Sequence, residues 1–375
     1  MQIFTRPEAV IFPYPLKELG DPQELLFFDI ETTGLSASQG QVYLIGALAY
    51  EAGEGWVLRQ WFADSLADEE AVLCAFFDFA SGFTTLIHFN GDSFDIPFLE
   101  KCAAQYGIAA PLGRLQSLDL YRLIRPYRKL FPDGRLNQKS MERWLGLTRL
   151  DRYTGGELIS VYEAYTVSGD AVLCRNLLLH NEEDLTGLPV LLSLLSIPDF
   201  FSGSFLRPEA EFSDGLLTLR AEASAALPAP LSLSAPDIAL SAEGSLLTLR
   251  ISAETGEMSH WFPDYMNYYY LPGEDCCVHK SVGEFVDRAC RQRATARTAF
   301  VRFTGTFIPV FRVPDQAAPV FRREFRDKAA FLELGSFLEA LPETKLSYIA
   351  DALTHLGLRN PDRARSDKET ERNGA

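Results

Sequence analysis

Two acidic residues follow directly after an apolar run near the start of the chain. The segment LLFFDIETTGL, residues 25–35, places Asp29 and Glu31 two positions apart behind four apolar side chains. Side chains alternate between the two faces of a strand, so Asp29 and Glu31 are expected on the same face. Two like charges at the end of a buried strand repel each other and lose hydration, which costs free energy unless something neutralises them. The pattern therefore predicts a partner of opposite charge.

Two later segments supply further acids that can join this pair. In HFNGDSFDIPFL, residues 88–99, Asp95 stands where an apolar strand ends and a helix begins. In LLLHNEEDLTGL, residues 177–188, His180 and Asp184 are four residues apart and so lie on one face of a helix. Four carboxylates are thereby expected to converge at the carboxyl end of a sheet: Asp29, Glu31, Asp95 and Asp184.

A cluster of unpaired carboxylates is unstable in a protein unless it binds hard divalent cations. Two such cations, roughly 3.5–4 Å apart, form the arrangement that enzymes use for in-line attack on a phosphodiester. One ion activates the attacking water, and both stabilise the charge that grows on the departing oxygen. The acids therefore predict two divalent ions, Mg²⁺ or Mn²⁺, as the neutralising charge.

The elements that must position these acids alternate between strand and helix patterns. Three strand-like runs joined by short loops come first, and the loop EAGEG has the composition of a hairpin. Helical and strand patterns then alternate, with mainly helices out to about residue 195. This order predicts an α/β unit, a mixed sheet covered by helices. Strands are expected at residues 24–30, 42–50, 56–63, 84–89 and 114–120, and the first helices at 68–81 and 94–106.

The second half of the chain has a different pattern. After a stretch rich in Pro, Gly, Ser and acids, the pattern is mostly β, and a short run occurs twice, as GLLTLR at 215–220 and SLLTLR at 245–250. Two copies are too few for a solenoid, so paired strands of one sheet are expected. The predicted organisation is an α/β domain at 1–198, a linker at 199–215, a β-rich accessory domain of unknown role at 216–358 and a disordered tail at 359–375.

The net charge of the chain is −16, so its overall field does not attract nucleic acid, and a polyanion has to be held locally. Lys and Arg are concentrated at residues 122–152, among aromatic residues, and a second basic run lies at 288–302. The first run fits either a nucleic-acid contact, with rings for stacking bases, or a solvated surface, and the second run fits an extension of the substrate path. The second run also fits an interface with the acidic domain.

Cysteine usage and the N-terminus bear on the compartment. The six cysteines have neither the spacing of a disulfide framework nor that of a zinc site. The N-terminal residues MQIFTRPEAV lack the basic start, apolar middle and cleavage site of a secretory signal. No uninterrupted apolar run reaches membrane-spanning length. These features predict a cytoplasmic protein without a membrane partner, and they leave its oligomeric state open.

The acidic segments resemble the motifs of a known superfamily. FDIETTGL looks like the first motif of the DEDD (DnaQ-like) 3′→5′ exonucleases, which have an RNase H-like fold. The segment NGDSFD, Asn90 to Asp95, is similar to the second motif, and His180 with Asp184 stands where the third belongs. The wider run most resembles the YprB-like branch of predicted exonucleases. The resemblance covers roughly residues 24–195.

This resemblance implies a 3′→5′ exonuclease with two metal ions that acts on single-stranded DNA or RNA ends. It implies an RNase H-like mixed sheet flanked by helices, with a smaller, mostly β domain after it. The implied metal ligands are Asp29, Glu31, Asp95 and Asp184. His180 is the implied general base, although it stands at the four-residue spacing that relatives use for Tyr. Substrate contacts are implied for Thr32, Thr33, Gly34, Asn90 and Phe94.

Two other functions remain open from the sequence. One is a nuclease-derived module that binds nucleic acid or recruits a protein through the C-terminal half. The other is a structure-specific endonuclease on the same fold. The choice between DNA and RNA also stays open, because no base-reading motif is present and selection by the 2′-hydroxyl depends on the shape of the pocket.

Overall fold

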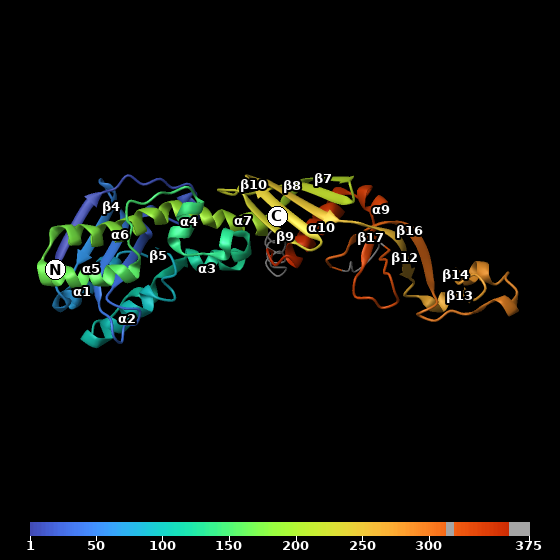
Figure 1. The fold of residues 1–375 in the computed structure, drawn as a ribbon, viewed down its shortest axis with the longest axis horizontal. Coiled ribbons are helices and arrows are strands. Elements are labelled where there is room, and N and C mark those ends of the chain that lie inside the picture. Colours follow the sequence, from blue (N-terminus) through green and yellow to red (C-terminus); the bar gives the residue numbers. More distant parts are fainter. Residues whose placement is uncertain (313–318, 360–375) are drawn as a thin grey trace. The chain divides into compact units, whose positions relative to one another are not determined.

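The computed structural model describes residues 1–312 and 319–359 of the chain, which forms two compact units (Figure 1). The first unit comprises Met1–Asp199 with Leu227–Ala229, and the second comprises Phe200–Ala226 and the described residues from Pro230 on. The chain passes from one unit to the other within a short helix, α7 (Ser196–Ser202).

The first unit is built on a six-stranded mixed sheet in the order β1-β4-β3-β2-β5-β6. The strands β1, β4, β3 and β2 pair in antiparallel fashion, whereas β5 runs parallel to both β2 and β6. The predicted mixed sheet is therefore confirmed. Its strands are β1 (Gln2–Pro7), β2 (Leu25–Thr32), β3 (Val42–Glu51), β4 (Gly55–Phe62), β5 (Thr85–His88) and β6 (Gln116–Asp119).

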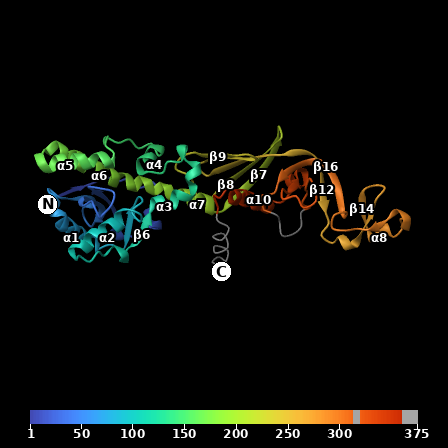
Figure 2. The same cartoon turned by 60° about the horizontal axis from the view of Figure 1, so that its bottom comes forward.

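Helices cover both faces of this sheet (Figure 2). On one face Phe28 of β2 stacks on Phe76 of α1. On the other face α6 packs across β2, β3 and β4, and α5 packs beside α6. The helices of the unit are α1 (Glu69–Ala80), α2 (Asp95–Tyr106), α3 (Leu120–Ile124), α4 (Gln138–Trp144), α5 (Gly155–Ser168) and α6 (Ala171–Leu191).

The segment Ala171–Ser202, which runs from α6 into α7, is long and apolar enough to cross a membrane by length and composition. However, 67% of its most apolar window is buried inside the protein, as in the core helix of a folded domain. The apolar surface of α6 is thus used mainly for packing on the sheet.

Gly46 allows α6 to lie close to the strand that carries the acids. It is the cross-strand partner of Asp29 in the β2–β3 pair. A Cβ atom at Gly46 would lie 2.1 Å from Oδ1 of Asn181 and 2.4 Å from a methyl carbon of Leu185, both on α6. Any side chain at this position would therefore displace the side chains of Asn181 and Leu185, which α6 packs against the sheet.

The second unit is mostly antiparallel β structure, as expected for the region after the α/β domain. Its largest sheet has the order β7-β8-β11-β10-β9, and two three-stranded sheets have the orders β12-β16-β17 and β14-β13-β15. The strands are β7 (Phe205–Ser213), β8 (Leu216–Ala223), β9 (Leu231–Ala235), β10 (Ile238–Glu243), β11 (Leu246–Ser252), β12 (Glu254–Trp261), β13 (Tyr268–Leu271), β14 (Cys276–His279), β15 (Gln292–Arg293), β16 (Phe300–Pro309) and β17 (Phe331–Glu333). Three helices accompany them, α8 (Lys280–Gly283), α9 (Leu334–Leu338) and α10 (Pro342–His355).

The repeated run in this unit forms two neighbouring strands. The two copies occupy β8 and β11, which pair in antiparallel fashion with Leu219 opposite Leu249. Thr218 faces Arg250 and Arg220 faces Thr248, so the two copies are related by a local twofold arrangement. The prediction of paired strands in one sheet is confirmed.

Two segments of the chain differ from the sequence expectations. The predicted linker at 199–215 contains the strand β7, whose residues are mostly exposed because it lies at the edge of its sheet. The first strand, β1, was not expected for the same reason, since it is an edge strand with little burial. The predicted tail at 359–375 lies outside the described residues except for Arg359.

The substitution Gly46→Ala is expected to lower the free energy of unfolding by about 1–3 kcal/mol, because the added methyl group overpacks the contact between β3 and α6. Chemical denaturation followed by circular dichroism measures this change. Gly113→Ala is the matched control, because a Cβ atom at Gly113 meets nothing within 4 Å. Equal stability of the two variants would contradict the proposed role of Gly46.

Candidate active site and metal centre

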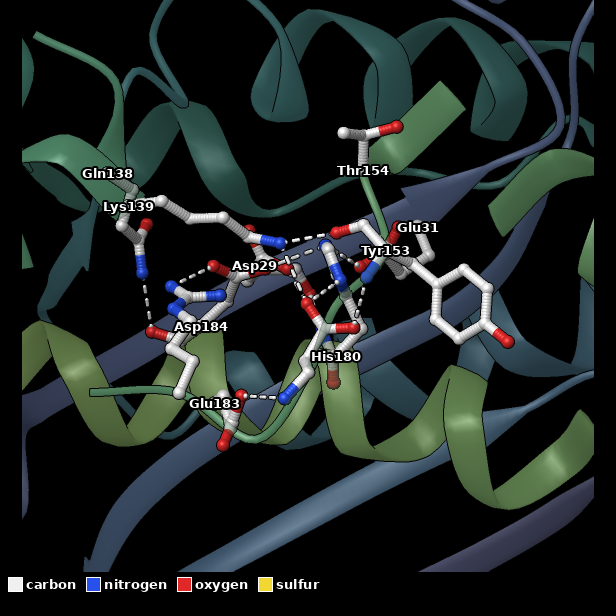
Figure 3. A network of polar contacts seen from close by, with 12 residues as sticks. Asp29, Glu31, Gln138, Lys139, Tyr153, Thr154, His180, Glu183 and Asp184 are labelled. Atoms are coloured by element: carbon white, nitrogen blue, oxygen red, sulfur yellow. Dashed lines mark hydrogen bonds and ion pairs between the residues drawn. The ribbon is translucent and has the colours of Figure 1, made fainter. Parts of the chain in front are cut away.

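Four side chains expected to do chemistry, those of Asp29, Glu31, His180 and Asp184, meet where α6 crosses β2 (Figure 3). The ligand atoms of Glu31, His180 and Asp184 all lie within 4.8 Å of one another. Asp29 and Asp95 belong to the same cluster, because the charges of Asp184 and Asp95 act on Asp29. Asp29 and Glu31 come from β2, Asp95 is the first residue of α2, and the other two lie one turn apart on α6.

Burial and mutual repulsion make this cluster costly in the absence of a cation. Burial, followed by the charges of the neighbouring acids, raises the pKa values of Asp29 and Glu31 well above their ordinary range. Burial also raises the pKa of Asp95 from 3.8 to about 7. The cluster therefore binds protons near neutral pH, and a bound divalent cation would replace them.

Asn181 holds the carboxylate of Asp29. Its Nδ2 donates to Oδ2 of Asp29 at 2.9 Å and to the backbone oxygen of Asp29 at 3.3 Å. Its Oδ1 accepts a 2.9 Å hydrogen bond from Gln60 on β4, which also donates to the backbone oxygen of Leu178. This network fixes the Asn181 amide so that its donor faces Asp29, and neither amide residue was predicted to lie in the site.

Arg149 neutralises part of the charge on Asp184. Its Nη2 donates to Oδ1 of Asp184 at 2.6 Å, and the same guanidinium forms an ion pair with the buried Glu142 on α4. A Cβ atom at Gly187 would lie 2.3 Å from Oε1 of Glu142, so a glycine there makes room for this pair. Arg149 was expected to lie on a basic surface or to contact nucleic acid, but it lies inside the site.

His180 is held by a buried carboxylate on the side away from the acids. Its Nδ1 lies 2.7 Å from Oδ2 of Asp151, whose side chain is 1% exposed. Lys139 donates to the same oxygen at 2.7 Å, and the backbone N–H of Tyr153 donates to the other oxygen at 3.0 Å. Lys139, also part of the predicted basic run, is thus used internally (Figure 3).

The other ring nitrogen of His180 faces the acids. Its Nε2 lies 3.3 Å from Oδ2 of Asp184 and 3.7 Å from Oε1 of Glu31. Burial lowers the pKa of His180, which favours the neutral ring. Because the Asp151 carboxylate only accepts hydrogen bonds, the proton of a neutral ring stays on Nδ1 and the lone pair of Nε2 is available.

The loop before α2 is held by Asp119 at the end of β6. The Asp119 carboxylate accepts hydrogen bonds from the backbone N–H groups of Asn90 at 2.8 Å and of Asp92 at 3.3 Å. It also caps α3 by accepting from the backbone N–H of Arg122, so its role is structural. At the other end of the loop, Oδ1 of Asp95 accepts a 3.3 Å hydrogen bond from the backbone of Ile30 on β2.

Two cavities meet at the acids. A cavity of about 310 Å³ is lined by Glu31, Asp29 and Asp184 together with Thr32, Leu35, Phe94, Ile159 and others. A second cavity, of about 480 Å³, shares Asp29 and Asp184 and is lined further by Phe89, Asn90, Tyr121, Arg128 and others. Three of the five expected substrate contacts, Thr32, Asn90 and Phe94, therefore face a cavity.

The other two expected contacts, Thr33 and Gly34, are not among the residues that line either cavity. The backbone N–H of Thr33 donates to the backbone oxygen of Gln41, and its hydroxyl accepts from the backbone N–H of the same residue. These groups close the turn after β2. The backbone N–H of Thr33 is thus already paired and is not free for a substrate.

The donor set fits a divalent metal ion. It combines carboxylate oxygens and one imidazole nitrogen, which are common ligands of such ions in proteins. The raised pKa values show that the positive groups nearby do not fully compensate the acids. Within residues 1–312 and 319–359, Glu31, His180 and Asp184 are the one group of three or more His, Cys, Asp or Glu side chains placed closely enough to share an ion.

The raised pKa of Asp95 predicts a pH-dependent stability of the metal-free protein. The folded protein keeps a proton on Asp95 up to about pH 7, whereas the unfolded chain releases it near pH 3.8. Stability is therefore expected to rise as the pH falls from about 8 to about 5.5, measured as Tm in a chelating buffer. Excess Mg²⁺ or Mn²⁺ should weaken this dependence, because the ion takes the place of the proton.

The variant Asp95→Asn isolates this effect from the general effect of the net charge. Lowering the pH reduces the repulsion among all acids in both proteins, but only the wild type gains a proton at Asp95. The Tm of the variant should therefore change less with pH. Parallel Tm profiles of the two proteins would contradict the role assigned to Asp95.

The fold and the site can be compared with known proteins. Residues 26–196 match the model of the RNase H superfamily. No curated protein sequence matches the chain. Among solved structures, a family B DNA polymerase from the hyperthermophilic archaeon Pyrobaculum calidifontis aligns with 97% of this chain at 12% identity and a TM-score of 0.42. This chain covers 53% of the polymerase, about half its length.

A second solved structure, the ExoI/SSB-Ct complex, aligns with 91% of this chain and 72% of its own, at 11% identity and a TM-score of 0.27. The assignment of the fold thus depends on the family model and on the sheet. The matched segment contains all five residues of the cluster and the strands β2 to β6. Residues 26–196 have an RNase H-like α/β fold, and a mostly antiparallel β unit follows them.

Proposed function

We propose that this protein is a metal-dependent nuclease, and more specifically a 3′→5′ exonuclease that hydrolyses phosphodiester bonds at single-stranded nucleic-acid ends. One observation carries the proposal: the carboxylates of Asp29 and Glu31 on β2 and of Asp95 on α2 are buried with raised pKa values beside Asp184 of α6, on an RNase H-like fold. A module that only binds nucleic acid would gain nothing from this costly cluster. A divalent metal site explains it.

The residues that would hold the ions are Asp29, Glu31, Asp95 and Asp184. Two bound ions would supply an activated water and would stabilise the charge on the departing oxygen. Asn181 holds one oxygen of Asp29 and leaves the other for an ion. Arg149 does the same for Asp184, because it bonds to Oδ1 while Oδ2 faces His180.

His180 contributes the lone pair of Nε2. This nitrogen can accept a proton from an attacking water, as a general base does, or it can bind a cation. It cannot do both at once. The general-base role implied by the family motif is therefore one of two uses of the same atom, and the buried Asp151 supports either use by fixing the ring.

The arrangement of the two cavities favours a nucleic-acid substrate with a free strand end. They share Asp29 and Asp184, so the scissile phosphate would lie at these acids with one cavity on either side. The smaller cavity, of about 310 Å³, has a size at the lower limit of single-ligand pockets and would take the terminal nucleotide. The larger cavity would take the rest of the strand.

The larger cavity has the side chains that single strands need. The rings of Phe89 and Tyr121 lie 5.9 Å apart, and the exposed Arg128 donates to the Tyr121 hydroxyl at 3.3 Å. Rings stack on unpaired bases of any sequence, and a guanidinium contacts the phosphate backbone. Arg128 belongs to the basic run predicted at 122–152. Unlike Arg149 and Lys139, it is accessible to a strand.

Asp29→Asn is expected to reduce divalent-ion-dependent hydrolysis on the order of 1,000-fold, because it removes a charged metal ligand. The assay follows mononucleotides released from labelled single-stranded DNA and RNA with Mg²⁺ or Mn²⁺. The control is Glu70→Gln, which neutralises an exposed acid on α1 away from the cluster. If the wild type degrades neither substrate, or if Asp29→Asn degrades them equally well, the proposed function is wrong.

Circular single-stranded substrates distinguish the two kinds of nuclease. An exonuclease needs an end, so the wild type should cut linear strands and leave circles intact under the same conditions. Products from circles would instead assign an endonuclease to the same site. Labels at the 5′ or the 3′ end then report the direction of cleavage.

Tyr121→Ala is expected to raise the KM for single strands about 5- to 150-fold at an unchanged kcat, because stacking one base contributes about 1–3 kcal/mol. Tyr121→Phe keeps the ring and should retain the KM of the wild type. Steady-state kinetics on a labelled oligonucleotide measures both values. A lower kcat with an unchanged KM would argue against a binding role for Tyr121.

A further inference from the structure

We propose that a cation bound between Glu31 and Asp184 is also bound by Nε2 of His180, so that this position selects Mn²⁺ over Mg²⁺. The inference rests on the proposed metal-dependent function and names the ligand set and the metal of one position. It also assigns to His180 a role as ligand in place of general base.

The distances suit a shared ion. Ligand atoms about 2.1 Å from one ion lie roughly 3 to 4.2 Å apart, depending on whether they are adjacent or opposite. Nε2 of His180 lies 3.3 Å from Oδ2 of Asp184 and 3.7 Å from Oε1 of Glu31. All three ligand atoms lie within 4.8 Å of one another. Small side-chain movements are enough to place one ion among them.

The helix itself provides the spacing for chelation. His180 and Asp184 are separated by four residues on α6, so their side chains project from adjacent turns on one face. The same separation places two ligands on one ion in helical zinc motifs. Glu31 approaches from β2 on the opposite side, which gives the site a third ligand from a second element.

Asp151 fixes the ring as metalloproteins fix their histidine ligands. A metal-bound histidine donates its other N–H to a carboxylate or a carbonyl, which sets its tautomer and orientation. Here Nδ1 of His180 donates to Asp151, which is 1% exposed and receives further hydrogen bonds from Lys139 and from the backbone of Tyr153. The backbone N–H groups of Leu150 and Asp151 are held by Glu183, so this support is itself anchored to α6.

A nitrogen ligand changes the metal preference. Mg²⁺ requires oxygen ligands in near-ideal octahedral geometry and loses water reluctantly. Imidazole is a softer ligand and suits first-row transition metals. A site with one imidazole and two carboxylates is therefore expected to hold Mn²⁺ more tightly than Mg²⁺, whereas a site of carboxylates alone would discriminate less.

The direct test is pulsed electron paramagnetic resonance on the full chain loaded with less than one equivalent of Mn²⁺. Electron spin echo envelope modulation should show ¹⁴N coupling from a bound imidazole in the wild type. Labelling histidine with ¹⁵N should replace the ¹⁴N modulation by that of ¹⁵N. This control needs no variant, so it does not depend on a variant folding. The coupling should be absent in His180→Gln and present in His355→Gln, which changes an exposed histidine on α10.

Titration calorimetry tests the selectivity. His180→Gln should weaken Mn²⁺ binding on the order of 100-fold and Mg²⁺ binding by less than about threefold. Circular dichroism of the metal-free variants checks their folding. A wild type that binds Mn²⁺ without nitrogen coupling, one that binds no Mn²⁺, or a His180→Gln variant that loses both ions equally would overturn the inference.

Nuclease assays on the same samples separate this inference from the proposed function. Nitrogen coupling without hydrolysis would contradict the proposed nuclease function and support the metal site with its histidine ligand. Hydrolysis without nitrogen coupling would support the nuclease and overturn the histidine ligand.

Discussion

The structure of the first unit depends on the burial of like charges at one end of a sheet. Three of the four acids have a hydrogen-bond partner that limits this cost: Asn181 for Asp29, the backbone of Ile30 for Asp95 and Arg149 for Asp184. These partners do not suffice, since burial and the neighbouring charges still raise the pKa of Asp29 well above its ordinary range. Protons, or a divalent cation in their place, would offset the remaining cost.

The close approach of α6 to the sheet makes this arrangement possible. Two positions without side chains provide the space, Gly46 for the Asn181 amide and Gly187 for Glu142, which holds Arg149. The helix α6 carries His180, Asn181 and Asp184, and glycines on β3 and on α6 itself leave room for the supporting side chains. The same helix packs across β2, β3 and β4, so it contributes both to the packing of the sheet and to the cluster.

The sequence predicted the acids and the mixed sheet because both leave local patterns, an apolar run before Asp29 and alternating strand and helix periods. It could not predict Asp151 or the role of Arg149, because both lie in the irregular segment between α4 and α5, where no periodicity specifies the path. Nor does composition distinguish an internal ion pair from an exposed one, which is why Arg149 was interpreted together with Arg128. The edge strands β1 and β7 bury too little to alternate clearly.

The charges of the site also bear on the order in which a metal ion and a substrate would bind. If the site acts on a phosphodiester, as proposed, the acids that line both cavities would repel it when they are ionised and no cation is bound, and so would the net charge of −16. Bound cations reverse the sign of this local field. Metal and substrate binding would then be coupled, and by linkage the substrate would tighten metal binding by the same factor. Arg128 lines the larger cavity and would attract a strand with or without the metal, so this coupling would come from the acids rather than from the basic surface.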